Sequence, residues 1–402
     1  MDNRRILICG AGIAGPTLAY WLRAAGFTPT IVEQSPTLRS GGYVIDFWGL
    51  GYDIAGKMGL LPEISRIGYH MREMRVVNGR NERVAGFGAA IFDELTGGRF
   101  VTLARSDLSR LIFERITDHA DILFGEQIVG IAPQDDGVEV TFERRDTRRF
   151  DLVIGADGLH SKVRELLFGT QDRFETALGY AAAAFEVDGY QPRDESVYVL
   201  YNRPGRMVAR FALHDARTLF LFVFAIGPDD QPAPRVPEAQ KAQLRRIYAD
   251  ARWECPRILD ELDRAPTLYF DRVSQIRMDT WSRGRIALVG DAAFCPSLMA
   301  GQGSALAMTA AYVLAGELAQ ADGRHDEAFR AYEARLRPFI AAKQASAAHF
   351  AGLFAPKTRA GLFLRNQMLR AFGIPGLARL VIGRDLVDSL RLPAYHFAGA
   401  AS

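Results

Sequence analysis

The N-terminal end of the chain carries the pattern that most restricts how it can fold. A short apolar strand over residues 5–9 runs directly into Gly10-Ala11-Gly12-Ile13-Ala14-Gly15, and a helix follows over residues 16–25. A second apolar strand, residues 31–33, ends in Glu33. Strand, glycine turn, helix and strand in this order predict a βαβ unit that binds a dinucleotide.

Each glycine of the turn has its own physical role. Gly10 allows the tight turn, Gly12 lets the backbone approach a pyrophosphate, and Gly15 lets the helix pack close to the strand. Glu33 stands about 20 residues further on, where an acidic side chain binds the adenosine ribose. A glycine-rich turn without a ligand is the alternative, and the flanking strand, helix and acid argue against it.

A second glycine-rich loop lies near the C-terminal third of the chain. Residues 285–289 predict a buried strand, which Gly290-Asp291-Ala292-Ala293 follows at once. Pro296 and then Gly301-Gln302-Gly303 lead into a helix predicted over residues 304–318. The pattern places a carboxylate at a strand end and a glycine pair at a helix N-terminus. Such a corner offers an acceptor to sugar-like hydroxyls and free N–H groups to an electron-rich ligand.

A third segment favours FAD over a nicotinamide dinucleotide. Residues 150–158 form an apolar strand that ends in Asp157-Gly158, and Ser161 and Arg164 stand on a short helical start behind it. A nicotinamide dinucleotide on one Rossmann half has no evident need for two distant loops. An extended FAD has, because its ribityl chain and ring lie beyond the pyrophosphate.

With these three motifs in this order, the chain resembles the class A flavoprotein aromatic hydroxylases, which share the p-hydroxybenzoate hydroxylase fold. It is most similar to the tetracycline-inactivating and polyketide-tailoring members, over roughly the first 350 residues. The resemblance implies an α/β protein. It would have a Rossmann-like FAD-binding domain, an inserted antiparallel β-sheet substrate domain and a C-terminal helix.

The resemblance also implies roles for individual residues. Glu33 would bind the adenosine ribose, Arg105 the FAD phosphates and ribityl chain, and Asp291 the ribityl hydroxyls. Asp157 would support the pyrophosphate region and the approach of the pyridine nucleotide. The N–H groups of residues 301–303 would face the N1–C2=O edge of the flavin. The predicted non-covalent FAD site therefore consists of Gly10, Gly12, Ala14, Gly15, Glu33, Arg39, Asp46, Arg105, Asp157, Asp291, Pro296, Gly301, Gln302 and Gly303.

Three of these assignments leave alternatives open. Arg105 could instead be a surface-paired arginine at a helix start. Arg39 could face either the nicotinamide nucleotide or FAD. The alignment of Asp46 with the family is uncertain by one residue.

The predicted FAD-binding domain is discontinuous. It comprises residues 1–72, 101–170 and 280–350, the substrate domain comprises residues 73–100 and 171–279, and residues 351–402 form bracing C-terminal helices. A membrane-surface helix is the alternative for the amphipathic C-terminal part.

Aromatic residues of the inserted sheet are the candidates for the substrate pocket. Alternation places Phe220, Phe222 and Phe224 on one face, and Tyr201 and Arg210 lie on neighbouring strands. Arg210 could pair with an acidic or phenolate substrate. Such a phenylalanine stripe is more often plain core, and Arg210 could be a surface residue.

The resemblance implies an FAD-dependent monooxygenase that consumes NADPH or NADH. It would hydroxylate an aromatic or polyketide-like molecule with O₂ through a flavin C4a-hydroperoxide. No second glycine fingerprint appears, so the reductant would dock briefly; NADPH is favoured by resemblance alone. This chemistry requires no acid or base at a fixed motif, and no catalytic residue is predicted.

Departures from the family pattern keep two other functions open. Phe294 replaces a frequent histidine, and Ala305 and Ala310 replace polar residues of the following helix. The alternatives are a flavin reductase or oxidase of another class, and a non-catalytic FAD-binding accessory protein. A halogenase is excluded by the missing lysine and WxWxIP-like segment.

Composition sets broad limits on function. A net charge of +2 without dense basic runs argues against nucleic acid. The 3 cysteines and 7 histidines show no spacing typical of metal ligands. The scattered cysteines, without disulfide spacing, suit a reducing cytoplasm. We expect no stable membrane anchor, because no long apolar stretch appears. Substrate identity and oligomeric state cannot be read from the sequence.

Overall fold

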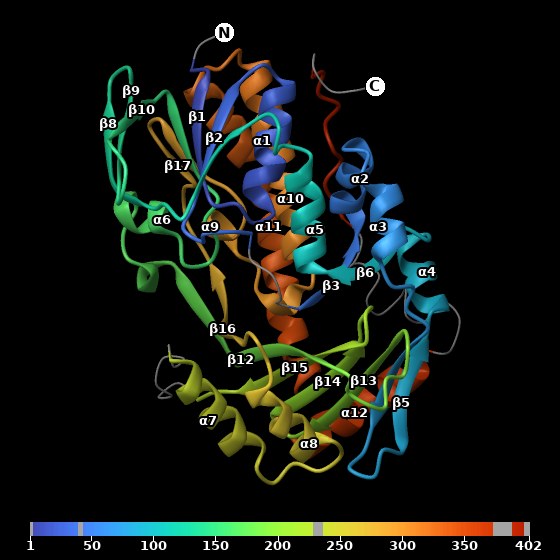
Figure 1. Cartoon of the computed structure of the whole chain (residues 1–402). Coiled ribbons are helices and arrows are strands. Elements are labelled where there is room, and N and C mark those ends of the chain that lie inside the picture. The colour runs from blue at the N-terminus through green and yellow to red at the C-terminus, as the bar shows by residue number, and fades with distance from the viewer. Residues whose placement is uncertain (1–2, 39–42, 228–235, 373–387, 398–402) are drawn as a thin grey trace.

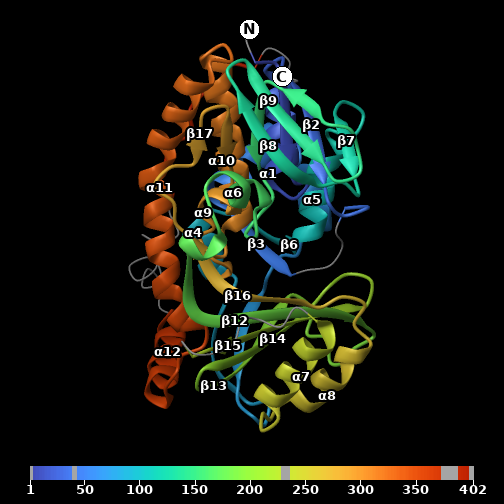
Figure 2. The ribbon, with the colours of Figure 1, turned by 90° about the vertical axis from the view of Figure 1, so that its left-hand side faces the viewer.

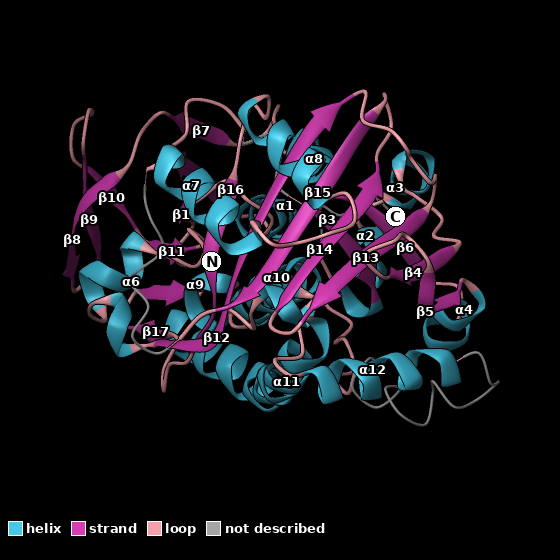
Figure 3. Cartoon of the chain, turned by 90° about the horizontal axis from the view of Figure 1, so that it is seen from below, coloured by secondary structure: helices cyan, strands magenta, loops and turns pink. Residues whose placement is uncertain are grey.

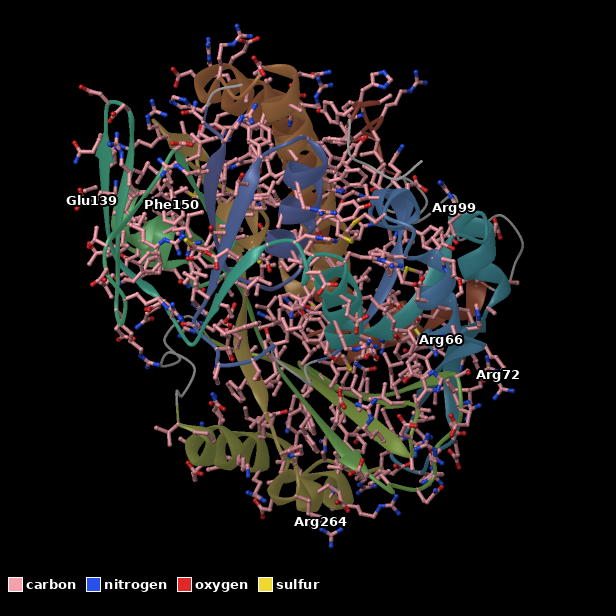
Figure 4. All side chains as sticks on the ribbon, turned by 45° about the horizontal axis from the view of Figure 1, so that its top comes forward. Arg66, Arg72, Arg99, Glu139, Phe150 and Arg264 are labelled. Atoms are coloured by element: carbon pink, nitrogen blue, oxygen red, sulfur yellow. The ribbon has the colours of Figure 1, made fainter. Side chains whose placement is uncertain are left out.

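The computed structural model describes residues 3–38, 43–227, 236–372 and 388–397. Its upper half in Figure 1 is built on a mostly parallel sheet, and its lower half on a larger, mostly antiparallel sheet. Charged side chains such as those of Arg99 and Arg264 lie at the periphery (Figure 4).

The six-stranded sheet carries all three glycine motifs. Its order is β17 (Ser282–Arg283), β18 (Ile286–Leu288), β11 (Leu152–Gly155), β1 (Arg5–Cys9), β2 (Thr28–Glu33) and β7 (Asp121–Phe124). All neighbours pair in parallel except β17 and β18. The central strands are almost wholly buried, which explains their unbroken apolar sequences. Because the carboxyl ends of parallel strands share one edge, the loops after β1, β11 and β18 meet there.

The seven-stranded sheet forms the second half of the molecule. Its order is β16 (Tyr269–Ile276), β12 (Glu175–Asp188), β15 (Arg217–Ala225), β14 (Arg206–Ala212), β13 (Val197–Arg203), β4 (Glu73–Val77) and β5 (Arg83–Gly88). Only β13 and β4 run parallel. Two small sheets complete the strands: β8 (Ile128–Gln134), β9 (Gly137–Phe142) and β10 (Arg148–Phe150), and the antiparallel pair β3 (Val44–Trp48) and β6 (Phe100–Ala104).

The long helices connect the two halves. The helix α10 (Gly303–Gln320) is almost entirely buried and packs against α1 (Ala14–Ala24) and α2 (Gly49–Lys57). Figure 2 shows α11 (His325–Phe354) running along one side of the molecule toward α12 (Arg359–Ala371) beside the seven-stranded sheet. The helices α7 (Pro237–Tyr248) and α8 (Cys255–Asp260) cover the sheet face that points away from the six-stranded sheet (Figures 1 and 3).

The remaining helices are short or lie at the margins of the sheets. They are α3 (Leu61–Ile67), α4 (Ala90–Thr96), α5 (Arg105–Glu114), α6 (Lys162–Leu167), α9 (Asp291–Phe294), η1 (Gln171–Arg173), η2 (Glu261–Asp263) and η3 (Leu298–Ala300).

The architecture confirms the predicted fold class, an α/β protein with a Rossmann-like sheet, an antiparallel sheet and C-terminal helices. The predicted domain boundaries stay a proposal. Among the described residues, no helix combines the length and apolar character needed to cross a membrane.

Candidate functional site

The glycine turn after β1 is tightly packed on one side and open on the other. Gly10 has a φ of +110°, and a Cβ there would lie 2.5 Å from the carbonyl oxygen of Ala156. A Cβ on Gly15 would lie 1.9 Å from the carbonyl oxygen of Gly10. A Cβ on Gly12, in contrast, would meet only Arg105 Nη2, at 3.7 Å. The turn therefore has room for a ligand at Gly12 and none at the other two glycines.

The helix behind this turn presents a positive end. Within the described residues no side chain caps the N-terminus of α1, and its first turn contains no acid. Its first N–H groups and the dipole thus favour a diphosphate. Ala14 lies in that turn, and Glu33 accepts hydrogen bonds from Ala11 N and Ser35 N, both at 2.9 Å. These bonds hold the Glu33 carboxylate beside the turn, at the position predicted for the ribose.

Asp291 and Arg105 come together from different elements. Asp291 is the first residue of α9, after Gly290 with its φ of +66°. Burial raises the pKa of Asp291, while the nearby Arg105 and a hydrogen bond from Cys295 lower it. Arg105 thus stands between the first glycine turn and the third motif. This position agrees with the predicted contact of Arg105 with FAD, which stays a prediction.

The N-terminus of α10 forms an open cradle. In the described part of the chain, α10 has no capping side chain and no acid in its first turn. A Cβ on Gly303 would meet nothing within 4 Å, whereas Gly301 has a φ of +64° and faces Trp48. Gln302 is buried, and Pro296 accepts a hydrogen bond of 3.1 Å from Gln275 Nε2 that fixes the loop. The free N–H groups and helix dipole suit an electron-rich ring edge.

The second motif, residues 157–164, is held in place by its own hydrogen bonds. Asp157 accepts hydrogen bonds from Ser161 Oγ at 2.5 Å and from Val163 N at 3.0 Å. Burial raises the pKa of Asp157. Arg164, only 1% exposed, donates to the Ala292 carbonyl at 2.9 Å. The carboxylate of Asp157 thus organises its own loop, and Arg164 ties that loop to the third motif; the predicted contact of Asp157 with the pyrophosphate stays a prediction.

Asp46 connects the two halves of the molecule. It accepts hydrogen bonds from Thr102 Oγ1 at 2.6 Å and from the Tyr198 hydroxyl, on β13, at 3.1 Å. Burial raises the pKa of Asp46 and that of Tyr198. Asp46 therefore lies at the boundary with the seven-stranded sheet. Its predicted contact with FAD remains a prediction, and Arg39 lies outside the described residues.

Two of the departures from the family pattern have packing explanations. Phe294 is buried and packs on Trp281 with ring centroids 4.6 Å apart. Ala305 faces α2, where a Cβ on Gly51 would lie 2.5 Å from Ala305 Cα. A larger residue at position 305 would push α2 away from α10, so the small side chain of Ala305 is explained by helix packing.

The structure places the phenylalanine stripe in a core, which was the alternative to the substrate pocket. Phe220, Phe222 and Phe224 are fully buried against α7 and α8, on the face that points away from the glycine motifs. Phe222, for example, packs edge-on against Tyr248 with ring centroids 5.0 Å apart. The predicted alternation is right, but the stripe belongs to the core under these helices.

Arg210 and Tyr201 lie on the same covered face. Arg210 is 1% exposed and forms ion pairs with Glu254, at 3.0 Å, and with Asp194. The Tyr201 hydroxyl accepts a hydrogen bond of 3.2 Å from Arg252 N. Both side chains therefore take part in the packing of the sheet against its helices, and a contact of either one with a substrate stays a prediction.

The opposite sheet face carries the aromatic residues that sequence reasoning missed. Tyr43 packs against Tyr269 with ring centroids 5.5 Å apart, and Tyr198 packs against Phe211 at 4.5 Å. Together with Phe100 they form what we name the aromatic layer, which separates β3 and β6 from the large sheet. For Tyr198, Phe211 and Tyr269 the other phase of the same alternation was a signal, but Tyr43 precedes β3 and Phe100 lies on β6, outside the large sheet.

Comparison with known proteins supports this picture. A family model described as an FAD binding domain matches residues 3–346. A flavin-dependent monooxygenase from an unknown prokaryotic organism is 34% identical over 401 residues, which covers 98% of this chain and 99% of the relative.

Solved structures give the same result. Tetracycline destructase Tet(55) has a TM-score of 0.83 and 30% identity, with 98% of this chain and all of the other covered. Klebsiella pneumoniae HpxO, solved with FAD and uric acid, has a TM-score of 0.77 and 23% identity; 95% of this chain and 96% of that chain are covered. HpxO thus shares the fold.

Proposed function

Because this chain belongs to the FAD-binding monooxygenase family that the FAD binding domain model defines, we propose that it hydroxylates an aromatic or polyketide-like small molecule with electrons from NAD(P)H. The carrying observation is the position of the α10 N-terminus. Its open cradle at Gly303 begins the helix whose first turns lie beside the third motif: a Cβ on Gly290 would lie 3.2 Å from Ala14 Cβ and 3.5 Å from Ala307 Cβ. The aromatic layer lies between β3 and β6 of one half and the seven-stranded sheet of the other.

The residues of the site fit FAD. The open side of Gly12 and the α1 N-terminus would hold the diphosphate, and Arg105 and Asp291 would hold the chain that leads to the ring. The chemistry that FAD supplies when bound is electron uptake from NAD(P)H and transfer of one oxygen atom from O₂. The N-terminus of α10 would stabilise negative charge at the ring edge by about 0.3–2 kcal/mol.

The aromatic layer would bind the substrate and keep water out. Tyr43, Tyr198 and Tyr269 present apolar rings with polar tips, which suits an oxygenated aromatic compound. Exclusion of water protects reactive intermediates of the reaction from hydrolysis. The likeness to a tetracycline destructase over nearly the whole chain supports a polyketide-type substrate for this protein as well.

Steady-state turnover of the FAD-loaded protein tests this proposal. Tetracycline and a set of phenols are each added with NADPH, and NADPH oxidation, H₂O₂ and product mass are measured together. We expect one compound to accelerate NADPH oxidation and to gain one oxygen atom. NADPH oxidation with a reduced product would instead show a flavin reductase, and a protein that binds no FAD would refute the proposal.

A further inference from the structure

An open pocket of about 520 Å³ lies at one end of the seven-stranded sheet. Its walls are residues 78–80 of the turn between β4 and β5, Tyr201 and Arg203 of β13, and Asp250 and Arg252 of the loop after α7. We name it the Arg252 pocket. Because Tyr201 belongs to the core under α7 and α8, the pocket lies on the sheet face that points away from the glycine motifs. Its volume is in the range of small-molecule sites.

Trp253 ties the walls of the Arg252 pocket to one another. Its backbone N–H donates to the Gly79 carbonyl at 3.2 Å, and its indole Nε1 donates to Asn81 Oδ1 at 3.0 Å. A Cβ on Gly79 would lie 3.0 Å from Arg252 Cβ, so the stem of Arg252 packs directly on the turn. The shape of the pocket is therefore set by contacts of the protein itself.

The Arg252 pocket carries an excess of positive charge. Its described lining residues include three arginines but a single carboxylate, that of Asp250. Arg203 and Arg206 both pair with Asp250, at 3.2 and 2.6 Å. The hydrogen bond from Arg206 lowers the pKa of the Asp250 carboxyl. Because two arginines already compensate this carboxylate, it does not neutralise the charge of the other arginines in the pocket.

Arg80 and Arg252 supply the positive charge that remains. Within the described ranges the guanidinium of Arg252 forms no ion pair, and that of Arg80 has a carboxylate oxygen of Glu82 at 3.9 Å. A guanidinium has five donors and no acceptor, and its planar fork matches the oxygens of a phosphate group. Both side chains can therefore direct donors toward an anion in the pocket.

Tyr201 adds a hydroxyl to the wall of this pocket. Its oxygen accepts a hydrogen bond of 3.2 Å from Arg252 N, and its own proton has no acceptor in the part of the chain that the structure describes. The ring packs against Trp253 with centroids 5.9 Å apart, which holds the hydroxyl in place. A hydroxyl with an unused proton beside two guanidinium groups favours a ligand that is rich in acceptor oxygens.

We propose that the Arg252 pocket binds the phosphate or diphosphate group of a small molecule. Arg80 and Arg252 would neutralise the anion, and the Tyr201 hydroxyl would donate to one of its oxygens. The pocket and the glycine motifs lie on opposite sides of the large sheet, so this ligand would be neither FAD nor the molecule that is hydroxylated. The inference therefore adds a second ligand site to the protein and does not depend on the proposed function.

Calorimetric titration of the protein at saturating FAD tests the inference, because FAD then fills the diphosphate site at the first glycine turn. The probes are pyrophosphate and ADP, each at a constant ionic strength of about 0.15 M, where weak surface electrostatics are screened. We expect saturable binding at one site. Arg252→Gln should raise the Kd about 5-fold or more, since a charge-assisted hydrogen bond in an exposed pocket is lost. Tyr201→Phe should raise it roughly 3- to 10-fold.

Arg264→Gln is the matched control. Arg264 lies at the periphery outside the pocket, where it pairs with Glu261 at 3.3 Å (Figure 4), and its replacement removes the same charge. This variant should change the Kd less than twofold. Tighter binding of ADP would support a nucleotide-like ligand, and equal binding of both probes would support recognition of the diphosphate alone. No saturable binding of either probe would overturn the inference, and so would binding that Arg252→Gln weakens no more than Arg264→Gln does.

Discussion

Replacing two neighbouring residues of β15 separates the structural face of the large sheet from its substrate face. Phe222 is fully buried under α7 and α8, where it packs against Tyr248 and Phe185. Leu221 is half-buried and points to the opposite side, beside Tyr198. The two positions share one strand, so backbone effects are matched.

The expected sizes follow from burial. Truncation of a buried phenylalanine costs about 3–5 kcal/mol, because transfer and cavity terms add. Phe222→Ala should lose this amount in the free energy of unfolding. Leu221→Ala removes less buried surface and should lose about 1–2 kcal/mol.

Urea unfolding at saturating FAD and steady-state kinetics are the paired assays. Phe222→Ala should be much less stable but keep the KM of wild type at low temperature, where it remains folded. Leu221→Ala should lose only the smaller amount given above relative to wild type, but its KM for the substrate should change. A Phe222→Ala protein of wild-type stability with an altered KM would refute the assignment of the two faces.

Three further predictions concern charged groups. Arg105→Gln removes charge-assisted hydrogen bonds worth about 1.5–3 kcal/mol, so the Kd for FAD in a fluorescence titration should rise roughly 10- to 150-fold, and an unchanged Kd would contradict the assigned role. Burial lowers the pKa of Arg365 to about 10. Its Nε has no partner in the described structure. Its Nη2 donates a hydrogen bond of 2.9 Å to Asn202 Oδ1, but among the described residues no carboxylate forms an ion pair with it. A buried cation without an opposite charge destabilises, so Arg365→Met should raise the denaturant midpoint at pH 7 and not lower it. Burial raises the pKa of Asp46 above its ordinary 3.8, so the folded state holds this proton longer and stability falls as pH rises through that window. Asp46→Asn should remove this fall in stability, which begins as the pH rises above 3.8, whereas an identical profile would contradict it.

Local patterns were sufficient to predict the cofactor half of the molecule. Gly10, Gly15 and Glu33 follow from the spacing of one short segment, because the turn, the close helix packing and the acid are all set within it. The loops after β11 and β18 are distant in sequence, but each ends a parallel strand, so they share one edge. The contacts of these residues with FAD stay predictions.

The substrate half was harder to predict, for a physical reason. Alternation shows that a strand has two faces but not which one meets which neighbour, so core and substrate pocket both stayed open for the face of Phe222 until the packing of α7 and α8 was known. Arg210 suggested a surface or substrate role because its partners lie 16 and 44 residues away in sequence. The Arg252 pocket gives no local signal at all, since the segments that form its walls are distant in sequence.

The central claim is tested most directly by anaerobic stopped-flow reduction of the FAD-loaded protein by NADPH, followed by exposure to ¹⁸O₂. Tetracycline and the phenol set are the trial substrates. The account predicts that one of them strongly accelerates flavin reduction and that its product carries one ¹⁸O atom. Flavin reduction that is equally slow with every compound, or a product without the label, would contradict it.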